Sequence, residues 1–274
     1  RNGVTVTTHY EDGHIHGQRT RTFPHSQTHE VVEDYQRGTL VKRMNYDVRG
    51  IPMSESNYLS PSHTKTTTWY GRGTPKATEE IINGKLAYAE YFDPSNTLES
   101  KVENGTGIKT QRSSHGELIS RTYFDSYAIT QKETFHMNGI PYVSEFYKNG
   151  LLNGPRAVFT DSGSPVSQEQ YTEGLLNGLA TYYQNGLKYK ETPYVKGEKE
   201  GIERHYIDGE TLAEESEWHD DARHGPSVVF YDGVPSTSWY YNNEKVSRTK
   251  YDDLCKREDE LRLMNERAAM HKLF

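Results

Sequence analysis

The sequence predicts an all-β fold: an elongated, twisted antiparallel sheet of about ten β-hairpin repeats, followed by a C-terminal α-helix. Three observations support this prediction. Aromatic residues and glycines recur together with a period of about 23 residues. Turn dipeptides of the Asn-Gly and Asp-Gly type are abundant, and residues 251–274 contain neither glycine nor proline.

The repeat is clearest in residues 135–249. Four segments there follow the pattern aromatic-x-x-Gly-x-x-x-Gly, with another aromatic residue five positions after the second glycine. These segments begin at Tyr147, Tyr171, Tyr194 and Trp218. In the last of them the first glycine is replaced by Asp221, a residue type that tolerates left-handed backbone. Residues 1–134 carry a degenerate form of the pattern, best preserved from Tyr10 to Gly17.

Each repeat is expected to be one β-hairpin. The chain has eight Asn-Gly and three Asp-Gly pairs, which favour hairpins because a type I′ turn needs positive φ at both central residues. Short runs rich in β-forming residues, such as 180–183, lie between them. Two further units, near Pro61 and Ser126, lack the glycine signature. Since one hairpin is not stable alone, neighbouring units are expected to stack.

Residues 250–274 differ from the repeats and are expected to form a helical cap on the last hairpin. Asp252 or Asp253 could cap the start of this helix. Leu254, Leu261, Met264 and Ala268 form a one-sided apolar stripe. Docking of a partner helix, or self-association, is the alternative role for this segment.

Composition narrows the classes of partner. The net charge of −7 argues against nucleic acid and makes an anionic membrane an unfavourable partner, but it fits a basic protein.

Cys255 is the single cysteine, so neither an internal disulfide nor a Cys-x-x-Cys metal site can form. Only Lys256 and Arg257 lie beside it as activating neighbours. A cytoplasmic location is favoured, while the start at Arg1 instead of Met leaves processing or secretion open. The oligomeric state stays open.

Five aromatic residues are the predicted partner-binding set, because large aromatic side chains are enriched in binding hot spots. They are Tyr182, Trp218, Trp239, Tyr240 and Tyr241. The strictly periodic aromatics are expected to stack on one another as the thin core of the sheet.

Carboxylates and histidines are the other candidate groups. The carboxylates recur with the hairpins and are expected to be a solvated face or edge guard: Glu133, Glu145, Glu169, Glu191 and Glu215. Their alternative role is glycoside chemistry.

His14 and His16 suggest a zinc site, but they occupy a variable turn and are expected to be exposed. No nucleophile elbow, phosphate loop or metalloprotease motif occurs, so no catalytic residue, metal or cofactor is expected.

The segment from Tyr171 to Gly186 resembles the variant MORN repeat of bacterial YwqK-type antitoxin proteins, matching at Tyr171, Gly174, Gly178, Tyr183 and Gly186. The resemblance extends over residues 135–245 and, by phase, over residues 10–134. It implies a grooved sheet of hairpins, contact with a protein or a membrane, and no catalytic residues. We therefore expect a non-enzymatic protein-binding module, of antitoxin, immunity or scaffold type. The alternatives are a membrane-surface or lipid-associated MORN protein and a carboxylate-dependent hydrolase on a β-repeat scaffold.

Overall fold

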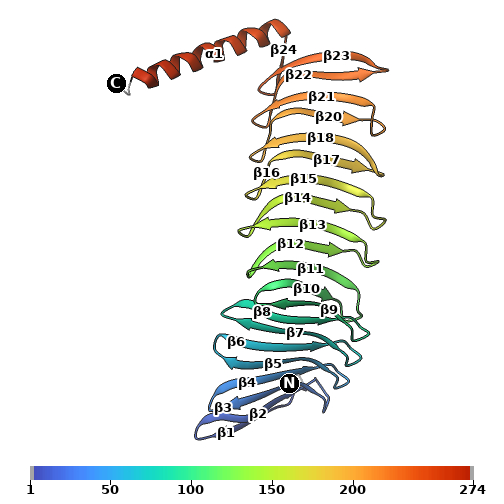
Figure 1. Cartoon of the computed structure of the whole chain (residues 1–274), viewed down its shortest axis with the longest axis vertical. Helices are drawn as coiled ribbons and strands as arrows, with labels where there is room; N and C mark the ends of the chain where they lie inside the picture. The colour runs from blue at the N-terminus through green and yellow to red at the C-terminus, as the bar shows by residue number, and fades with distance from the viewer. Residues whose placement is uncertain (1–2, 272–274) are drawn as a thin grey trace. The chain divides into compact units, whose positions relative to one another are not determined.

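A computed structural model describes residues 3–271 of the chain. These residues form β-hairpins whose strands pair antiparallel with their neighbours in sequence, and one C-terminal helix (Figure 1). The predicted class, an all-β open antiparallel sheet of hairpins with a C-terminal helix, is therefore confirmed. The chain divides into two compact units, Arg1–Gly150 (unit 1) and Leu151–Phe274 (unit 2).

Unit 1 contains thirteen strands among the described residues. They are β1 (Val6–Glu11), β2 (His14–Thr22), β3 (His29–Gln36), β4 (Thr39–Tyr46), β5 (Pro52–Ser60), β6 (His63–Trp69), β7 (Pro75–Ile82), β8 (Lys85–Phe92), β9 (Leu98–Glu103), β10 (Thr106–Arg112), β11 (Leu118–Asp125), β12 (Ala128–Phe135) and β13 (Pro141–Lys148). Its largest apolar cluster lies on β7–β9 and consists of Ala77, Leu86, Ala89, Tyr91 and Val102. This small cluster fits a thin sheet with little aliphatic interior.

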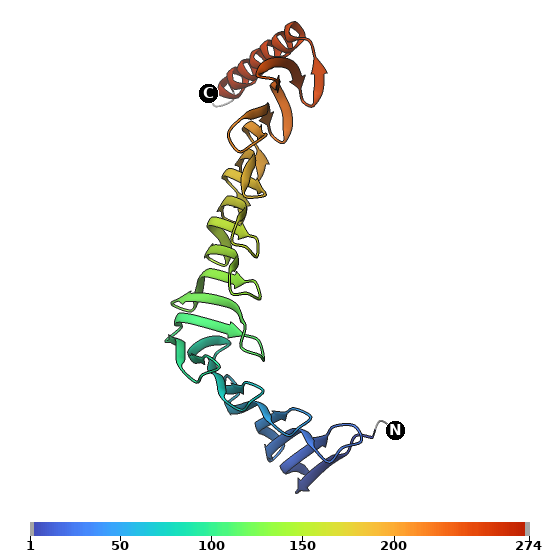
Figure 2. The same cartoon turned by 90° about the vertical axis from the view of Figure 1, so that its right-hand side faces the viewer.

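Unit 2 contains the remaining strands and the helix. They are β14 (Leu151–Phe159), β15 (Pro165–Thr172), β16 (Leu175–Leu176), β17 (Gly178–Gln184), β18 (Leu187–Val195), β19 (Glu198–Lys199), β20 (Gly201–Tyr206), β21 (Leu212–His219), β22 (Ala222–Tyr231), β23 (Val234–Tyr241), β24 (Glu244–Val246) and α1 (Arg248–His271). Small side chains occupy the middle of its strands: Ala180 is paired with Thr192, and Ser216 with Ser227. All four are buried. Within this unit the strands form one layer (Figure 2).

Two-residue turns form a row at one end of the strands in unit 2, and we call this row the turn edge. They comprise residues 173–174, 196–197, 220–221 and 242–243, all with left-handed backbone. Consecutive turns are linked because each donates a backbone hydrogen bond to the preceding hairpin, such as Gly174 N to Leu152 O at 2.8 Å and Gly197 N to Leu176 O at 2.7 Å. Asp221 has φ of 61°, as its position in the repeat predicts.

The two units that lack the glycine signature also form hairpins. Ser126 and Tyr127 have φ of 50° and 69°, so the turn between β11 and β12 keeps the left-handed conformation without glycine. A turn at Pro61 and Ser62 joins β5 to β6. The phase of the repeat therefore predicts hairpins at positions where the turn residues themselves give no signal.

Two Asn-Gly pairs do not form the turns predicted for them. Gly154 lies inside β14 opposite Tyr171, and Gly178 begins β17 opposite Tyr194. A Cβ at Gly178 would lie 3.1 Å from Cβ of Gln170, so glycine leaves room here for the side chain of the neighbouring strand. The preceding asparagines instead accept backbone hydrogen bonds from the next turn, Glu173 N to Asn153 Oδ1 at 3.3 Å and Lys196 N to Asn177 Oδ1 at 3.1 Å. Asn153 and Asn177 therefore each link their own hairpin to the turn of the next hairpin.

Helix α1 starts earlier than Asp252 or Asp253. Ser247 is the capping residue, since its Oγ accepts the N–H of Lys250 at 3.2 Å. The predicted apolar stripe does not lie on the sheet over its length, because Leu261 and Met264 are 59% and 65% exposed. The described residues include no helix with the length and apolar character needed to cross a membrane.

Candidate functional site

The five predicted partner-binding residues lie on two opposite faces of unit 2. Neighbouring residues on a strand point to opposite faces, and Tyr240 is paired with Gly225 whereas Trp239 is paired with Pro226. Tyr182, Trp218 and Tyr240 share one face, which we call the open face. Trp239 and Tyr241 share the other, which we call the helix face because α1 packs there. Whether any of the five binds a partner stays a prediction.

On the open face, cations of the same chain already cover the rings. Lys190 lies 4.5 Å from the ring centre of Tyr182, and Lys199 lies 4.0 Å from that of Trp218. Arg223 lies within 5.6 Å of the Trp218 ring and 5.5 Å of the Tyr240 ring. Such cation–π contacts stabilise a sheet that has few aliphatic residues. The three aromatic rings therefore belong to the packing of the sheet.

On the helix face, Trp239 and Tyr241 hold α1 against the sheet. The ring of Tyr251 lies 5.1 Å from that of Trp239 and 6.5 Å from that of Tyr241. The Tyr241 hydroxyl also donates to Glu258, and His224 packs its ring 5.5 Å from Tyr251. Neither Tyr251 nor His224 was singled out from the sequence. His224 precedes the repeat glycine Gly225, and this position is the only signal that could have identified it.

The recurring carboxylates are not a solvated face or an edge guard, which corrects the interpretation drawn from the sequence. Glu169 accepts from Tyr171 Oη at 3.1 Å and from Arg156 Nη1 at 2.9 Å, and its side chain is only 11% exposed. Glu191 accepts from Tyr206 and Lys188 in the same way. The other three also accept hydrogen bonds: Glu133 from Tyr123, Glu145 from Tyr147 and Glu215 from Arg204. Aromatic, carboxylate and cationic groups on the same strand and on neighbouring strands thus satisfy one another.

Two other carboxylates, Glu99 and Glu203, make the stability of the fold depend on pH. The Arg112 guanidinium holds the pKa of Glu99 below its usual range. Burial acts to raise the pKa of Glu203, but hydrogen bonds from Lys199 and Thr192 outweigh it, so that this pKa is lowered too. A depressed folded-state pKa stabilises the fold above the unfolded value of about 4.3 and ceases to do so as the pH falls through the folded value.

The free energy of unfolding should therefore stay level from about pH 7 to about pH 5 and fall steeply below about pH 4.5. Urea denaturation followed by circular dichroism at several pH values measures this dependence. A Glu203→Gln variant should lose less stability over the acid range than the parent, because it lacks one of the titrating groups. A free energy that stays level down to about pH 3 would contradict the expected role of these carboxylates.

A groove lies between α1 and the turn edge, with a cavity volume of about 610 Å³. We call it the C-terminal groove. Its lining residues are His219, Asp220, His224 and Asn242 from the sheet and Glu258, Asp259, Leu261, Arg262, Asn265 and Glu266 from α1. Four of these are acidic and one is a fixed cation, so the groove is acidic as a whole.

Charge is distributed unevenly between the two units. Residues 151–274 contain 22 Asp and Glu against 15 Lys and Arg, whereas residues 1–150 contain 17 of each. Residues 198–221, which lead to the groove, hold ten acidic and two basic side chains. The whole net negative charge of the chain therefore resides in unit 2, much of it near the C-terminal groove.

One group of side chains beside the groove has the composition of a metal site. Glu200, His219 and Asp220 place one ligand atom each within 4.8 Å of one another. Hydrogen bonds within the chain account for this arrangement, since Glu200 accepts from the His219 ring at 2.9 Å and from Asp220 N at 3.1 Å. The bond to Glu200 also raises the pKa of His219. His14 and His16 are separate from this group and bond to Asp12 O and Glu11.

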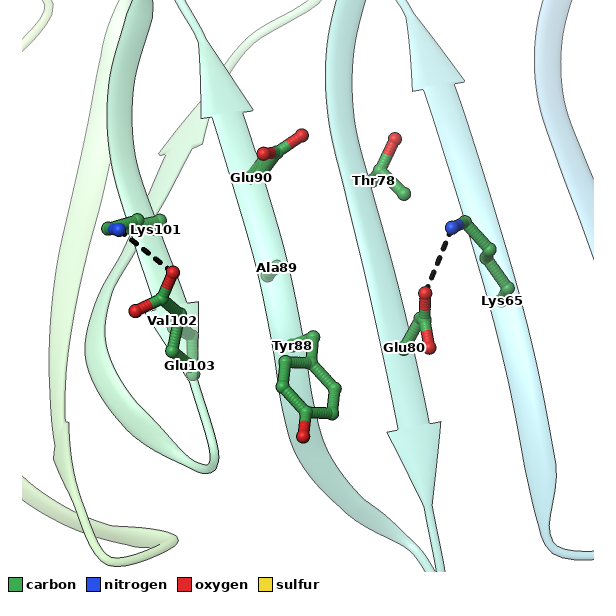
Figure 3. A pocket seen from close by; sticks show the side chains of 9 residues that line it. All are labelled: Lys65, Thr78, Glu80, Tyr88, Ala89, Glu90, Lys101, Val102 and Glu103. Atoms are coloured by element: carbon green, nitrogen blue, oxygen red, sulfur yellow. Dashed lines mark hydrogen bonds and ion pairs between the residues drawn. The ribbon is translucent and has the colours of Figure 1, made fainter.

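A second cavity, of about 350 Å³, lies in unit 1 (Figure 3). Three carboxylates line it, but two of them face lysines instead of each other. Lys65 on β6 donates to Glu80 on the neighbouring strand β7, and Lys101 donates to Glu103 on the same strand, β9 (Figure 3). This arrangement neutralises charge across the strands, whereas glycoside chemistry needs two carboxyl groups on opposite sides of one bond.

Comparisons with known proteins add little. No protein-family model matches the chain. No curated protein matches it either. Among solved structures, it is similar to one titled "Crystal Structure of TarM", with 14% sequence identity and a TM-score of 0.20 over 50% of this chain and 20% of that chain. The chain thus spans about a fifth of the TarM chain, and with a TM-score this low we infer neither fold nor function from the likeness.

Proposed function

We propose that the chain is a non-enzymatic protein-binding repeat module whose C-terminal groove receives a basic segment of a partner protein. The observation that carries the proposal is the concentration of acid there. Asp220 faces the groove from the sheet, and Glu258, Asp259 and Glu266 face it from α1. A groove lined by one sign of charge attracts a partner of the opposite sign and speeds its association.

The rest of the sheet supports this choice of surface. The rings of the open face are covered by Lys190, Lys199 and Arg223, and the recurring carboxylates are engaged by tyrosines and cations. The groove acids are more open: Asp220 and Asp259 are 73% and 65% exposed, and each pairs with an exposed side chain, His219 and Arg262 respectively. Leu261, 59% exposed, adds an apolar contact at the same place.

The resemblance to variant MORN repeats of YwqK-type antitoxin proteins points to the same class of function. That family works by contact and not by catalysis, so an antitoxin, immunity or scaffold role follows from the resemblance for this chain as well. A basic partner segment in the groove gives this role a physical basis, because acidic and basic surfaces recognise each other selectively.

A charge-matched pair of variants tests the proposal. The probe is a fluorescent peptide of alternating lysine, arginine and leucine, and its binding to the whole chain is followed by fluorescence anisotropy. The groove variant carries Asp220→Asn, Asp259→Asn and Glu266→Gln. The control variant carries Glu173→Gln, Glu210→Gln and Asp232→Asn, which remove the same charge from exposed positions that do not line the groove.

The parent should bind the peptide, and the groove variant should bind it about tenfold more weakly. The control variant should change the affinity less than about twofold, and binding of all three chains should weaken as salt rises from about 0.05 to about 0.3 M. Equal loss in both variants would mean that overall charge, and not the groove, attracts the peptide. Absence of binding by the parent would also overturn the proposal.

A further inference from the structure

The single thiol of the chain lies against a histidine. Cys255 is half-buried on α1, and its Sγ is 3.8 Å from Nε2 of His224 on β22, 31 residues away in sequence. The other ring nitrogen of His224, Nδ1, is 3.0 Å from Oδ1 of Asn242, in the turn after β23. Three separate elements of unit 2 thus bring together a thiol, an imidazole and a carboxamide.

The contact with Asn242 determines which nitrogen carries the proton. A carboxamide oxygen only accepts hydrogen bonds, so Nδ1 of His224 is the protonated nitrogen in the neutral ring. The lone pair then lies on Nε2, which faces the sulfur of Cys255. A proton acceptor is therefore in place for the thiol, and only the thiolate form of cysteine is a good nucleophile.

The C-terminal groove lies beside the thiol, because His224, which contacts the sulfur, lines it. His224 and Asn242 line it directly, and so does Glu258, one helical turn after Cys255. The cavity of about 610 Å³ is large enough for a small reagent and its leaving group.

The other titratable groups around Cys255 do not compete for its proton. Burial and a hydrogen bond with Cys255 raise the pKa of Tyr251, one turn earlier on α1. The hydrogen bond with Glu258 raises the pKa of Tyr241 to about 12. Both phenols therefore stay protonated near neutral pH. Asp252 and Glu217 lie near Tyr251, and Glu258 accepts from the Tyr241 hydroxyl.

We propose that Cys255 is a modification site for soft electrophiles, and in particular for small-molecule disulfides that enter through the C-terminal groove. The thiol proton passes to Nε2 of His224, and the sulfur attacks one sulfur of the disulfide. A new S–S bond forms between Cys255 and that sulfur as the old S–S bond breaks. The second half of the disulfide leaves as a thiolate and takes up the proton from His224. The incoming disulfide is the oxidant, and Cys255 is oxidised to a mixed disulfide.

The rate of alkylation tests the proposal on the intact chain. Iodoacetamide is the probe, because it is small and uncharged, and the rate is measured across neutral pH on the folded chain and on the same chain in urea. The folded chain should react about tenfold faster than the unfolded one near pH 7, because His224 takes up the thiol proton. A folded chain that reacts more slowly than the unfolded chain would overturn the proposal without any substitution.

Variants then assign the effect to the side chains. His224→Gln should remove the rate enhancement, and Asn242→Ala should reduce it, because the ring is no longer held in the reactive tautomer. His115→Gln, which replaces an exposed histidine of unit 1, is the matched control and should react like the parent. Glutathione disulfide should add one glutathione to the parent and none to Cys255→Ser, as mass spectrometry would show. An unchanged rate in a folded His224→Gln variant would contradict the role of the imidazole.

Discussion

Replacing Gly107 with alanine is expected to destabilise unit 1 by about 3 kcal/mol or more. Gly107 has φ of +138°, a conformation that L side chains rarely adopt. A Cβ at this position would lie 2.2 Å from the carbonyl oxygen of Lys101 and 2.9 Å from Cα of Val102. Both are backbone atoms, so no side-chain rotation relieves the clash, and Val102 is among the most buried residues of the chain.

Gly84→Ala is the matched control for this substitution. Gly84 also has positive φ, +74°, but nothing lies within 4 Å of the position where its Cβ would be. Its replacement should therefore cost only the left-handed backbone penalty of about 1 kcal/mol. Urea denaturation followed by circular dichroism compares the two variants with the parent. Similar losses in both would show that close approach between β9 and β10 is not what requires glycine at position 107.

Replacing Glu203 with alanine is expected to destabilise unit 2 by about 3 kcal/mol. Glu203 is 6% exposed and accepts hydrogen bonds from Thr192 Oγ1 at 2.8 Å, Lys199 Nζ at 2.9 Å and the His205 ring at 3.3 Å. Thr192 is fully buried. Removal of the Glu203 carboxylate leaves the Thr192 hydroxyl and the Lys199 ammonium group without their acceptor. The loss of stability is therefore larger than the net contribution of the Glu203–Lys199 ion pair.

Two further variants separate charge from packing at this position. Glu203→Gln keeps an acceptor for Thr192 and should lose about half as much stability as Glu203→Ala. Glu210→Ala removes an exposed carboxylate and should change the free energy of unfolding by less than about 0.5 kcal/mol. The account of the open face would be wrong if Glu203→Ala were no more damaging than Glu210→Ala in urea denaturation.

The hairpin fold could be predicted from sequence because its signals are local. A turn with left-handed backbone restricts its own two residues, and the same restriction returns with each repeat. Ser126 and Asp221 show that the phase of the repeat holds even where glycine is missing. The errors at Asn153 and Asn177 have the same origin. The dipeptide is identical in a turn and in a strand, and only stacking against the next hairpin distinguishes the two.

The arrangement of side chains on the two faces was harder to predict. Alternation along a strand assigns faces only while the register is regular, and the register shifts between Tyr182 and Tyr183 and again between His205 and Tyr206. The contact between Cys255 and His224 joins residues 31 positions apart. It depends on where α1 packs on the sheet, and no local pattern specifies that. The acidity of unit 2, in contrast, can be counted directly from the sequence.

Amide hydrogen exchange of the whole chain, with and without the lysine–arginine–leucine peptide, tests the central claim most directly. If the C-terminal groove receives a basic segment, added protection should appear in residues 219–224 and in residues 258–266 of α1, the two sides of the groove. The same protection should be absent from the groove variant. Protection spread over the open face around Tyr182 and Trp218, or confined to residues 1–150, would contradict the claim that the groove is the binding surface.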